Sequence, residues 1–186
     1  HKRYLGVLKD NENLIKKTLL KDIKKFNVII TTGGASVGEE DHLVKVIKKI
    51  GKVYFWKAAI KPGRPLAIGK IKNTIIICLP GNPVSVHLLY AMIINPFIIY
   101  LCTGKMNSPM GIKVKANFSM KKKHKRLEWL RVNIKEYKGE LIANKFLKQG
   151  SGMISSVVFS DGILEIPENI KKISKGDSYL YYSFHK

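Results

Sequence analysis

Apolar residues follow two different periods along the chain, and the change of period divides it into two parts. Before about residue 105, continuous apolar runs (26–30, 53–59, 66–69 and 74–79) alternate with segments of helical spacing (13–23 and 42–50). Continuous runs are typical of strands buried in a parallel sheet, and helices alternate with such strands in α/β domains. We therefore predict a three-layer α/β domain with a mainly parallel sheet.

Residues 83–101 form the longest apolar segment. It reaches only the lower length limit of a membrane span and contains His87, Asn95 and Pro96. We predict a helix that is buried in the protein and kinked at Pro96, and no membrane partner.

Beyond residues 106–111, apolar and polar residues alternate, which is typical of strands with one buried face. Asp161-Gly162 predicts a hairpin between residues 157–159 and 163–166, and residues 179–184 predict a last strand. A small antiparallel β-barrel would protect the edges of such strands. We therefore predict two domains, the α/β domain over residues 1–105 and the barrel over residues 106–186.

The charge of the chain is strongly positive and unevenly distributed. Its 186 residues include 34 basic and 13 acidic ones, and 30 of the basic residues are lysines. No carboxylate occurs from His42 to Leu127, where there are 17 cations, whereas Glu39, Glu40 and Asp41 directly precede this stretch. This arrangement favours an anionic small molecule with a divalent cation. A solvated lysine-rich surface explains much of the charge equally well.

Several classes of chemistry find no support in the residues. Two cysteines form neither a disulfide framework nor a zinc signature, so we expect core thiols at Cys78 and Cys102 and a cytoplasmic protein. No nucleophile elbow or Ser-His-Asp order indicates a serine hydrolase. The scarcity of arginine argues against nucleic-acid binding. Because the chain begins without methionine or a signal-peptide pattern, we expect a fragment or a processed chain.

The first candidate site is the polar loop Thr31–Asp41, which follows a predicted strand and precedes a predicted helix. Ligands of α/β sheets bind at the carboxyl ends of strands. Gly33 and Gly34 would let backbone N–H groups approach a phosphate, although glycine loops also simply make turns. Asp41 would either cap the helix or reach a metal ion.

Two further loops favour anions. Residues 57–65 combine two prolines with Lys57, Lys61 and Arg64, and an extended chain would place the two lysines on one face. A solvated basic turn is the alternative. Residues 79–85 read LPGNPVS, in which Asn82 is a good N-cap and Pro83 a good first helical residue. The free N–H groups of that helix would attract an anion, and a capped buried helix needs no ligand at all.

Taken in order, TTGGASVGEEDH, FWKAAIKPGRPLAIGK and LPGNPVSV resemble the molybdopterin molybdenumtransferase family, which includes MoeA and a domain of gephyrin. The later segments RLEWLRV, KQGSGMISS and KGD are similar in style. The resemblance covers nearly the whole chain. It implies a molybdopterin-binding α/β domain followed by the small C-terminal barrel domain.

The resemblance also implies an activity in molybdenum cofactor biosynthesis. Family members insert molybdate into adenylylated molybdopterin and release AMP with a divalent cation such as Mg²⁺. It implies a cytoplasmic homodimer in the full-length form, with other cofactor biosynthesis proteins as further partners. The catalytic residues would be Asp41, Lys57 and Lys61, with Asp41 near the metal ion. The substrate-binding residues would be Gly33, Gly34, Ser36, Gly38, Pro62, Gly63, Arg64, Pro80, Gly81, Asn82, Pro83, Ser85 and Ser151.

Two departures from the family pattern matter. Arg64 stands where the family usually has lysine, which keeps the charge but changes its geometry. Family proteins are about twice as long, so the chain would lack an N-terminal part and would be inactive by itself if that part completes the site. A non-catalytic molybdopterin-binding or scaffold relative and, less favoured, a basic nucleic-acid-binding protein remain the alternatives.

Overall fold

The computed structural model describes residues 2–34, 42–150 and 152–184. It divides into two compact units, one made of His1–Ala58 and Arg64–Gly81, the other of Ala59–Gly63 and Asn82–Lys186. The chain therefore passes between the units three times. Each compact unit is made of separate stretches of the chain, whereas each predicted domain is one continuous stretch. The domain boundary expected near residue 105 therefore stays a prediction.

The first unit is built on a four-stranded sheet of order β1-β5-β4-β2, which consists of β1 (Val28–Thr32), β5 (Thr74–Leu79), β4 (Ala67–Ile71) and β2 (Lys52–Trp56). The predicted α/β class is confirmed. The sheet is less parallel than predicted, because β1 and β5 are parallel whereas β4 is antiparallel to both of its neighbours. The two-residue turn between β4 and β5 is too short for a crossover, so these strands must run in opposite directions.

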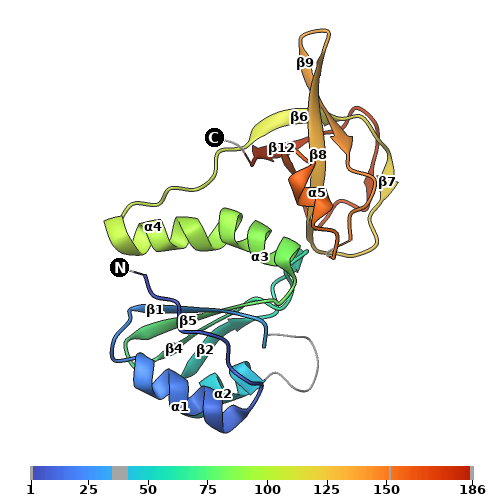
Figure 1. Cartoon of the computed structure of the whole chain (residues 1–186). Helices are drawn as coiled ribbons and strands as arrows, with labels where there is room; N and C mark the ends of the chain where they lie inside the picture. Colours follow the sequence, from blue (N-terminus) through green and yellow to red (C-terminus); the bar gives the residue numbers. More distant parts are fainter. Residues whose placement is uncertain (1, 35–41, 151, 185–186) are drawn as a thin grey trace. The chain divides into compact units, whose positions relative to one another are not determined.

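Two helices cover one face of this sheet (Figure 1). They are α1 (Glu12–Asp22) and α2 (His42–Ile50), and both were predicted from their helical spacing. Asn11 caps α1, since its side chain accepts a hydrogen bond from Leu14 N at 3.0 Å. The buried core between helices and sheet consists of Ile15, Leu19, Ile23, Ile29, Leu43, Val44, Val46, Ile47, Ala67, Ile71, Ile76 and Cys78.

In the second unit, the long apolar segment is helical throughout, as α3 (Pro83–Leu89), a π-helical turn η1 (Tyr90–Ile94) and α4 (Asn95–Thr103). The π-helical turn ends two residues before Pro96, which has no N–H to continue the α-helical ladder. The helix is less buried than predicted. Pro83–Thr103 is long and apolar enough to cross a membrane by length and composition, and 33% of its most apolar window is buried. Cys102, expected in the core, is exposed.

The predicted C-terminal barrel is confirmed. Its ring is β10-β12-β6-β9-β8, closed by a further pairing of β10 with β8. The ring strands are β6 (Ile112–Ala116), β8 (Leu127–Tyr137), β9 (Glu140–Lys145), β10 (Gly162–Ile166) and β12 (Ser178–Ser183). The ring is not wholly antiparallel as predicted, because β6 and β9 pair in parallel. Outside the ring, β3 (Ile60–Lys61) pairs with β8, and β7 (Met120–Lys121) pairs with β11 (Lys172–Ile173).

The hairpin predicted at Asp161-Gly162 is wrong. Residues Ser155–Val158 form a short helix, α5, and β10 pairs with β8 and β12 instead. The Asp161 carboxylate accepts a hydrogen bond from Ile134 N at 2.8 Å, and Asp161 N donates to Val132 O at 3.0 Å. Through these two hydrogen bonds to β8, Asp161 positions the start of β10 in the barrel and does not form a hairpin turn.

Candidate functional site

The two predicted glycine loops of the first unit meet at one edge of its sheet. Because β1 and β5 are parallel neighbours, both end at this edge, and Gly33 N extends their pairing by donating to Leu79 O at 3.1 Å. A Cβ atom added to Gly81 would lie 3.6 Å from the Cα atom of Gly33. Gly33, Gly34, Pro80 and Gly81 therefore form one continuous backbone surface, which we call the carboxyl edge.

Two cations flank the same edge. Since β2 and β5 are both antiparallel to β4, β2 runs in the direction of β5 and also ends there. Lys57 follows β2 directly, and its backbone N donates to Leu66 O at 3.1 Å. Arg64 lies just before β4 and is exposed. The carboxyl edge thus combines backbone groups with an ammonium and a guanidinium group, which is the chemistry that an anionic ligand needs.

Lys57 is held in an unusual conformation. Its φ angle is 70°, a left-handed value that few residues other than glycine adopt, and its Nζ atom lies 4.3 Å from the centre of the Trp56 ring. Lys48 of α2 approaches the same ring at 4.8 Å. The indole therefore fixes the position of the Lys57 ammonium group, a contact that sequence reasoning missed.

Two buried polar atoms of strands that end at the carboxyl edge have no hydrogen-bond partner within the described part of the chain. They are Oγ1 of Thr31, near the end of β1, and Nε1 of Trp56, at the end of β2. A buried polar group without a partner is costly, so such atoms call for a missing partner. Both residues lie at or next to the last residue of their strands, and the Trp56 side chain packs against the core between the sheet and its helices.

The remaining residues of the predicted basic loop belong to the second unit. Lys61 Nζ lies 2.8 Å from Oε1 of Glu128, whose side chain is only 6% exposed. Gly63 has a φ of 125°, and a Cβ atom there would approach Leu89 Cδ2 to 2.9 Å. Lys61 and Gly63 thus have structural roles in the described residues. The expected extended chain is broken by the left-handed Lys57, and a common anion for Lys57 and Lys61 stays a prediction.

Asn82 caps α3 as predicted. Its Oδ1 atom accepts hydrogen bonds from Val84 N at 3.1 Å and from Ser85 N at 3.4 Å, and Pro83 is the first helical residue. Ser85 is buried. The side chain therefore occupies two of the N–H groups that we expected to be free for an anion. The binding roles of Asn82, Pro83, Ser85 and Pro62 stay predictions.

Four predicted site residues, Ser36, Gly38, Asp41 and Ser151, lie outside the described residues. The loop on the N-terminal side of Ser151 is held by Arg131, which sequence reasoning did not single out. The Arg131 guanidinium donates to Ser156 Oγ at 3.1 Å, to Trp129 O at 3.0 Å and to Gln149 O. Burial lowers the pKa of Arg131 to about 10, against the opposing effect of Glu128. Alternation predicts an exposed residue here, but both faces of β8 are buried at this point.

Metal binding finds no support in the described residues. They contain no group of three or more histidine, cysteine or acidic side chains that could hold a metal ion. The described residues of the carboxyl edge offer cations and backbone groups, which do not suit Mg²⁺. The acidic residue expected to bind Mg²⁺, Asp41, lies outside the described residues.

Comparison with known proteins identifies the family. Residues 2–99 match the family described as a probable molybdopterin binding domain, and residues 113–184 match the MoeA C-terminal region, domain IV. The chain belongs to the MoeA family of molybdenum cofactor biosynthesis proteins. The first matched region falls within the predicted α/β domain, and the second falls within the predicted barrel domain.

The proteins similar to this chain are longer than the region that they share with it. A molybdopterin molybdenumtransferase of Haemophilus influenzae is 34% identical over 97% of this chain and 45% of its own length. Gephyrin of Dictyostelium discoideum is 28% identical over 92% of this chain and 27% of its own length. The crystal structure of a MoeA protein from Pyrococcus horikoshii superposes with a TM-score of 0.75 at 27% identity, covering 97% of this chain and 43% of that one. The chain thus spans less than half the length of these relatives.

Proposed function

We propose that the protein is a molybdopterin molybdenumtransferase, which inserts molybdate into adenylylated molybdopterin and releases AMP. The observation that carries this proposal is the carboxyl edge. There the loop after β1 and the loop after β5 come into contact between Gly33 and Gly81. At the same edge, Lys57 follows the end of β2 and Arg64 precedes the start of β4. Membership of the MoeA family supports the choice of substrate.

The chemistry of the edge suits this reaction. Molybdate and the phosphates of the substrate are anions, and the glycines allow them to approach backbone N–H groups without a Cβ atom in the way. The Lys57 ammonium is held on the Trp56 ring, so less of its side-chain freedom is lost on binding. Water attacks the phosphoanhydride bond, so AMP leaves and a phosphate stays on the pterin. The two dithiolene sulfurs replace two oxygen ligands of molybdate, which leave as water after taking protons from the thiols and from solvent. The protein contributes positioning and charge rather than a covalent nucleophile.

Several finer points belong to the same proposal. Mg²⁺ would accompany the nucleotide part of the substrate, with Asp41 as its protein ligand. The cytoplasmic location, the homodimer and further partners of cofactor biosynthesis remain proposals that follow from the resemblance. The similarity to gephyrin keeps open a non-catalytic molybdopterin-binding protein as the second candidate.

The test is AMP release from adenylylated molybdopterin in the presence of molybdate and Mg²⁺. We expect Asp41→Ala to abolish release while the circular dichroism spectrum is retained. Lys57→Gln should slow release at least about tenfold, because it removes a charge-assisted contact. Lys113→Gln, at an exposed lysine of the barrel, is the matched control and should release AMP at the unaltered rate.

Three outcomes would decide between the candidates. Saturable binding of the substrate without AMP release would support the non-catalytic protein. Unchanged release by Asp41→Ala and Lys57→Gln would contradict the proposed site. Tight binding of duplex or single-stranded oligonucleotides that survives physiological salt would favour the nucleic-acid-binding alternative.

A further inference from the structure

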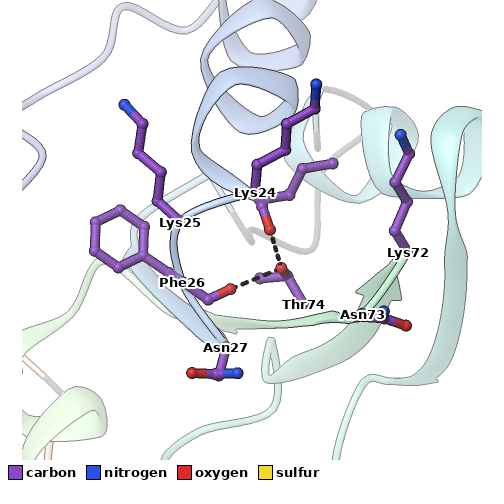
Figure 2. A pocket seen from close by; sticks show the side chains of 8 residues that line it. Lys24, Lys25, Phe26, Asn27, Lys72, Asn73 and Thr74 are labelled. Carbon is purple, nitrogen blue, oxygen red and sulfur yellow. Dashed lines mark hydrogen bonds between the residues drawn. The ribbon is translucent and has the colours of Figure 1, made fainter.

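A hollow lies at the opposite edge of the same sheet (Figure 2). It has a volume of about 390 Å³ and is lined by two segments, residues 23–27 before β1 and residues 72–74 between β4 and β5. Both segments adjoin the amino ends of β1 and β5, whereas the carboxyl edge lies at the other ends of these strands. The hollow, which we call the amino-edge pocket, is therefore separate from the site proposed above.

Hydrogen bonds hold the two segments of the amino-edge pocket together. The Thr74 hydroxyl lies 2.6 Å from Ile23 O and 2.7 Å from Phe26 O, as the dashed lines in Figure 2 show. Ile75 N donates to Asn27 O at 2.9 Å. Thr74 is only 1% exposed, so this link lies in the interior. The pocket is thus anchored to the core rather than formed by two independent loops.

The rim of the pocket is positively charged. Lys24 and Lys72 extend toward the same side of the pocket, whereas Lys25 extends away from Lys72, and the side-chain amides of Asn27 and Asn73 lie on the other side of the hollow (Figure 2). No carboxylate lines the pocket. Of the three lysines, Lys25 has an acidic neighbour, Asp22, at 3.7 Å. Lys24 and Lys72 enter none of the ion pairs found in the described part of the chain.

The end of α1 does not account for this charge. A helix C-terminus carries about half a negative charge, and Lys21 in the last turn of α1 already complements it. Two nearby carbonyl groups that would repel an anion, those of Ile23 and Phe26, face the Thr74 hydroxyl. Three lysines from segments nearly fifty residues apart exceed what the helix end requires.

We propose that the amino-edge pocket binds a small, multiply charged oxyanion of the phosphate class. The ammonium groups of Lys24 and Lys72 are the charge-assisted donors that such an anion would use. The volume of the pocket falls within the range of small-ligand sites. The site does not depend on the function proposed for the carboxyl edge, since it uses none of the same residues.

The structure offers a matched pair of substitutions for the test. Lys72 and Lys138 are each the first residue of a two-residue hairpin loop, with φ angles of 53° and 52°. Asparagine is favoured over lysine at positive φ, so Lys72→Asn and Lys138→Asn should each leave the fold intact or stabilise it. Only Lys72→Asn removes a charge from the pocket.

The probe is inorganic pyrophosphate, titrated into the protein without molybdopterin or molybdate and followed by calorimetry and by NMR. We expect saturable binding with shifted amide signals at Asn27, Asn73 and Thr74. Lys72→Asn should weaken this binding about fivefold and the Lys24→Gln, Lys72→Asn double variant about thirtyfold, since each removes one charge-assisted contact. Lys138→Asn should leave the affinity within about twofold, because its charge lies outside the pocket.

Two results would overturn the proposal. Equal weakening by Lys72→Asn and Lys138→Asn would mean that the anion responds only to overall charge. The absence of saturable binding, or shifts confined to Gly33 and Gly81, would mean that the amino-edge pocket holds no anion. Because AMP release is not part of this measurement, failure of the pocket leaves the proposed transferase activity untouched, and the reverse holds too.

Discussion

The barrel and the carboxyl edge of the first unit differ in how far their buried polar groups are satisfied. In the barrel, the Arg131 guanidinium donates to Ser156 Oγ, and Trp129 Nε1 donates to Glu165. At the carboxyl edge, Thr31 Oγ1 and Trp56 Nε1 are buried without a partner within the described residues. The barrel has one comparable atom, Ser160 Oγ.

This difference separates polar groups that serve the fold from polar groups that are available to a ligand. A satisfied network fixes one arrangement of the chain, and its loss is paid in stability. Open donors and cations at a strand end cost stability until a ligand binds them. Substitutions in the barrel should therefore lower the free energy of unfolding more than they weaken substrate binding. Substitutions at the carboxyl edge should do the opposite.

The largest effect is expected at Arg131. Arg131→Met removes the four hydrogen bonds of the guanidinium and leaves the carbonyl groups of Trp129 and Gln149 without this donor. We expect the free energy of unfolding to fall by about 3 kcal/mol, measured by urea unfolding. Arg131→Lys keeps the charge but loses the planar, forked donor geometry of the guanidinium. Its free energy of unfolding should lie between that of the unaltered protein and that of Arg131→Met. A loss below about 1 kcal/mol for Arg131→Met would contradict the role of the network.

A pair of glycines should separate fold from binding more sharply. Gly63→Ala forces a side chain onto a φ of 125° and against Leu89, and it should cost about 2 kcal/mol of unfolding free energy. A Cβ atom on Gly81 meets only Gly33 at an ordinary 3.6 Å, so Gly81→Ala should unfold like the unaltered protein. Its effect should appear as weaker substrate binding. If Gly81→Ala binds normally, no ligand approaches the backbone there.

A smaller loss of stability than for Arg131→Met or Gly63→Ala is expected at Asn82. Asn82→Ala loses the cap of α3 and should cost about 1 kcal/mol in thermal or urea unfolding. Asn82→Asp keeps the cap and adds a negative charge that favours the helix end but repels an anion. We expect full stability and weaker substrate binding for Asn82→Asp. Unaltered binding would show that Asn82 is a cap and nothing more.

Local patterns were sufficient for much of this fold. Helical spacing predicted α1 and α2, and apolar runs located β1, β4 and β5 within one or two residues. The loop motifs at Gly33, Lys57 and Gly81 predicted where an anion would bind, and β-strand order places these three at one sheet edge. Binding itself stays a prediction.

Other features were not accessible from such patterns. The hairpin signal at Asp161-Gly162 is local, but Asp161 bonds to β8 residues far away in the sequence. Alternation placed Arg131 on the exposed face of β8, and only the closed barrel with the loop at Gln149 buries it. The partner of Lys61, Glu128, likewise follows from the pairing of β3 with β8.

The sequence by itself determined the elements, their order and the chemistry of the loops, because these depend on side chains within a few residues of each other. Tertiary structure decided the strand directions, the closure of the barrel and the choice of partner for each buried charge. Those choices bring together residues that are distant along the chain, and they are fixed by hydrogen bonds and burial that no local pattern contains.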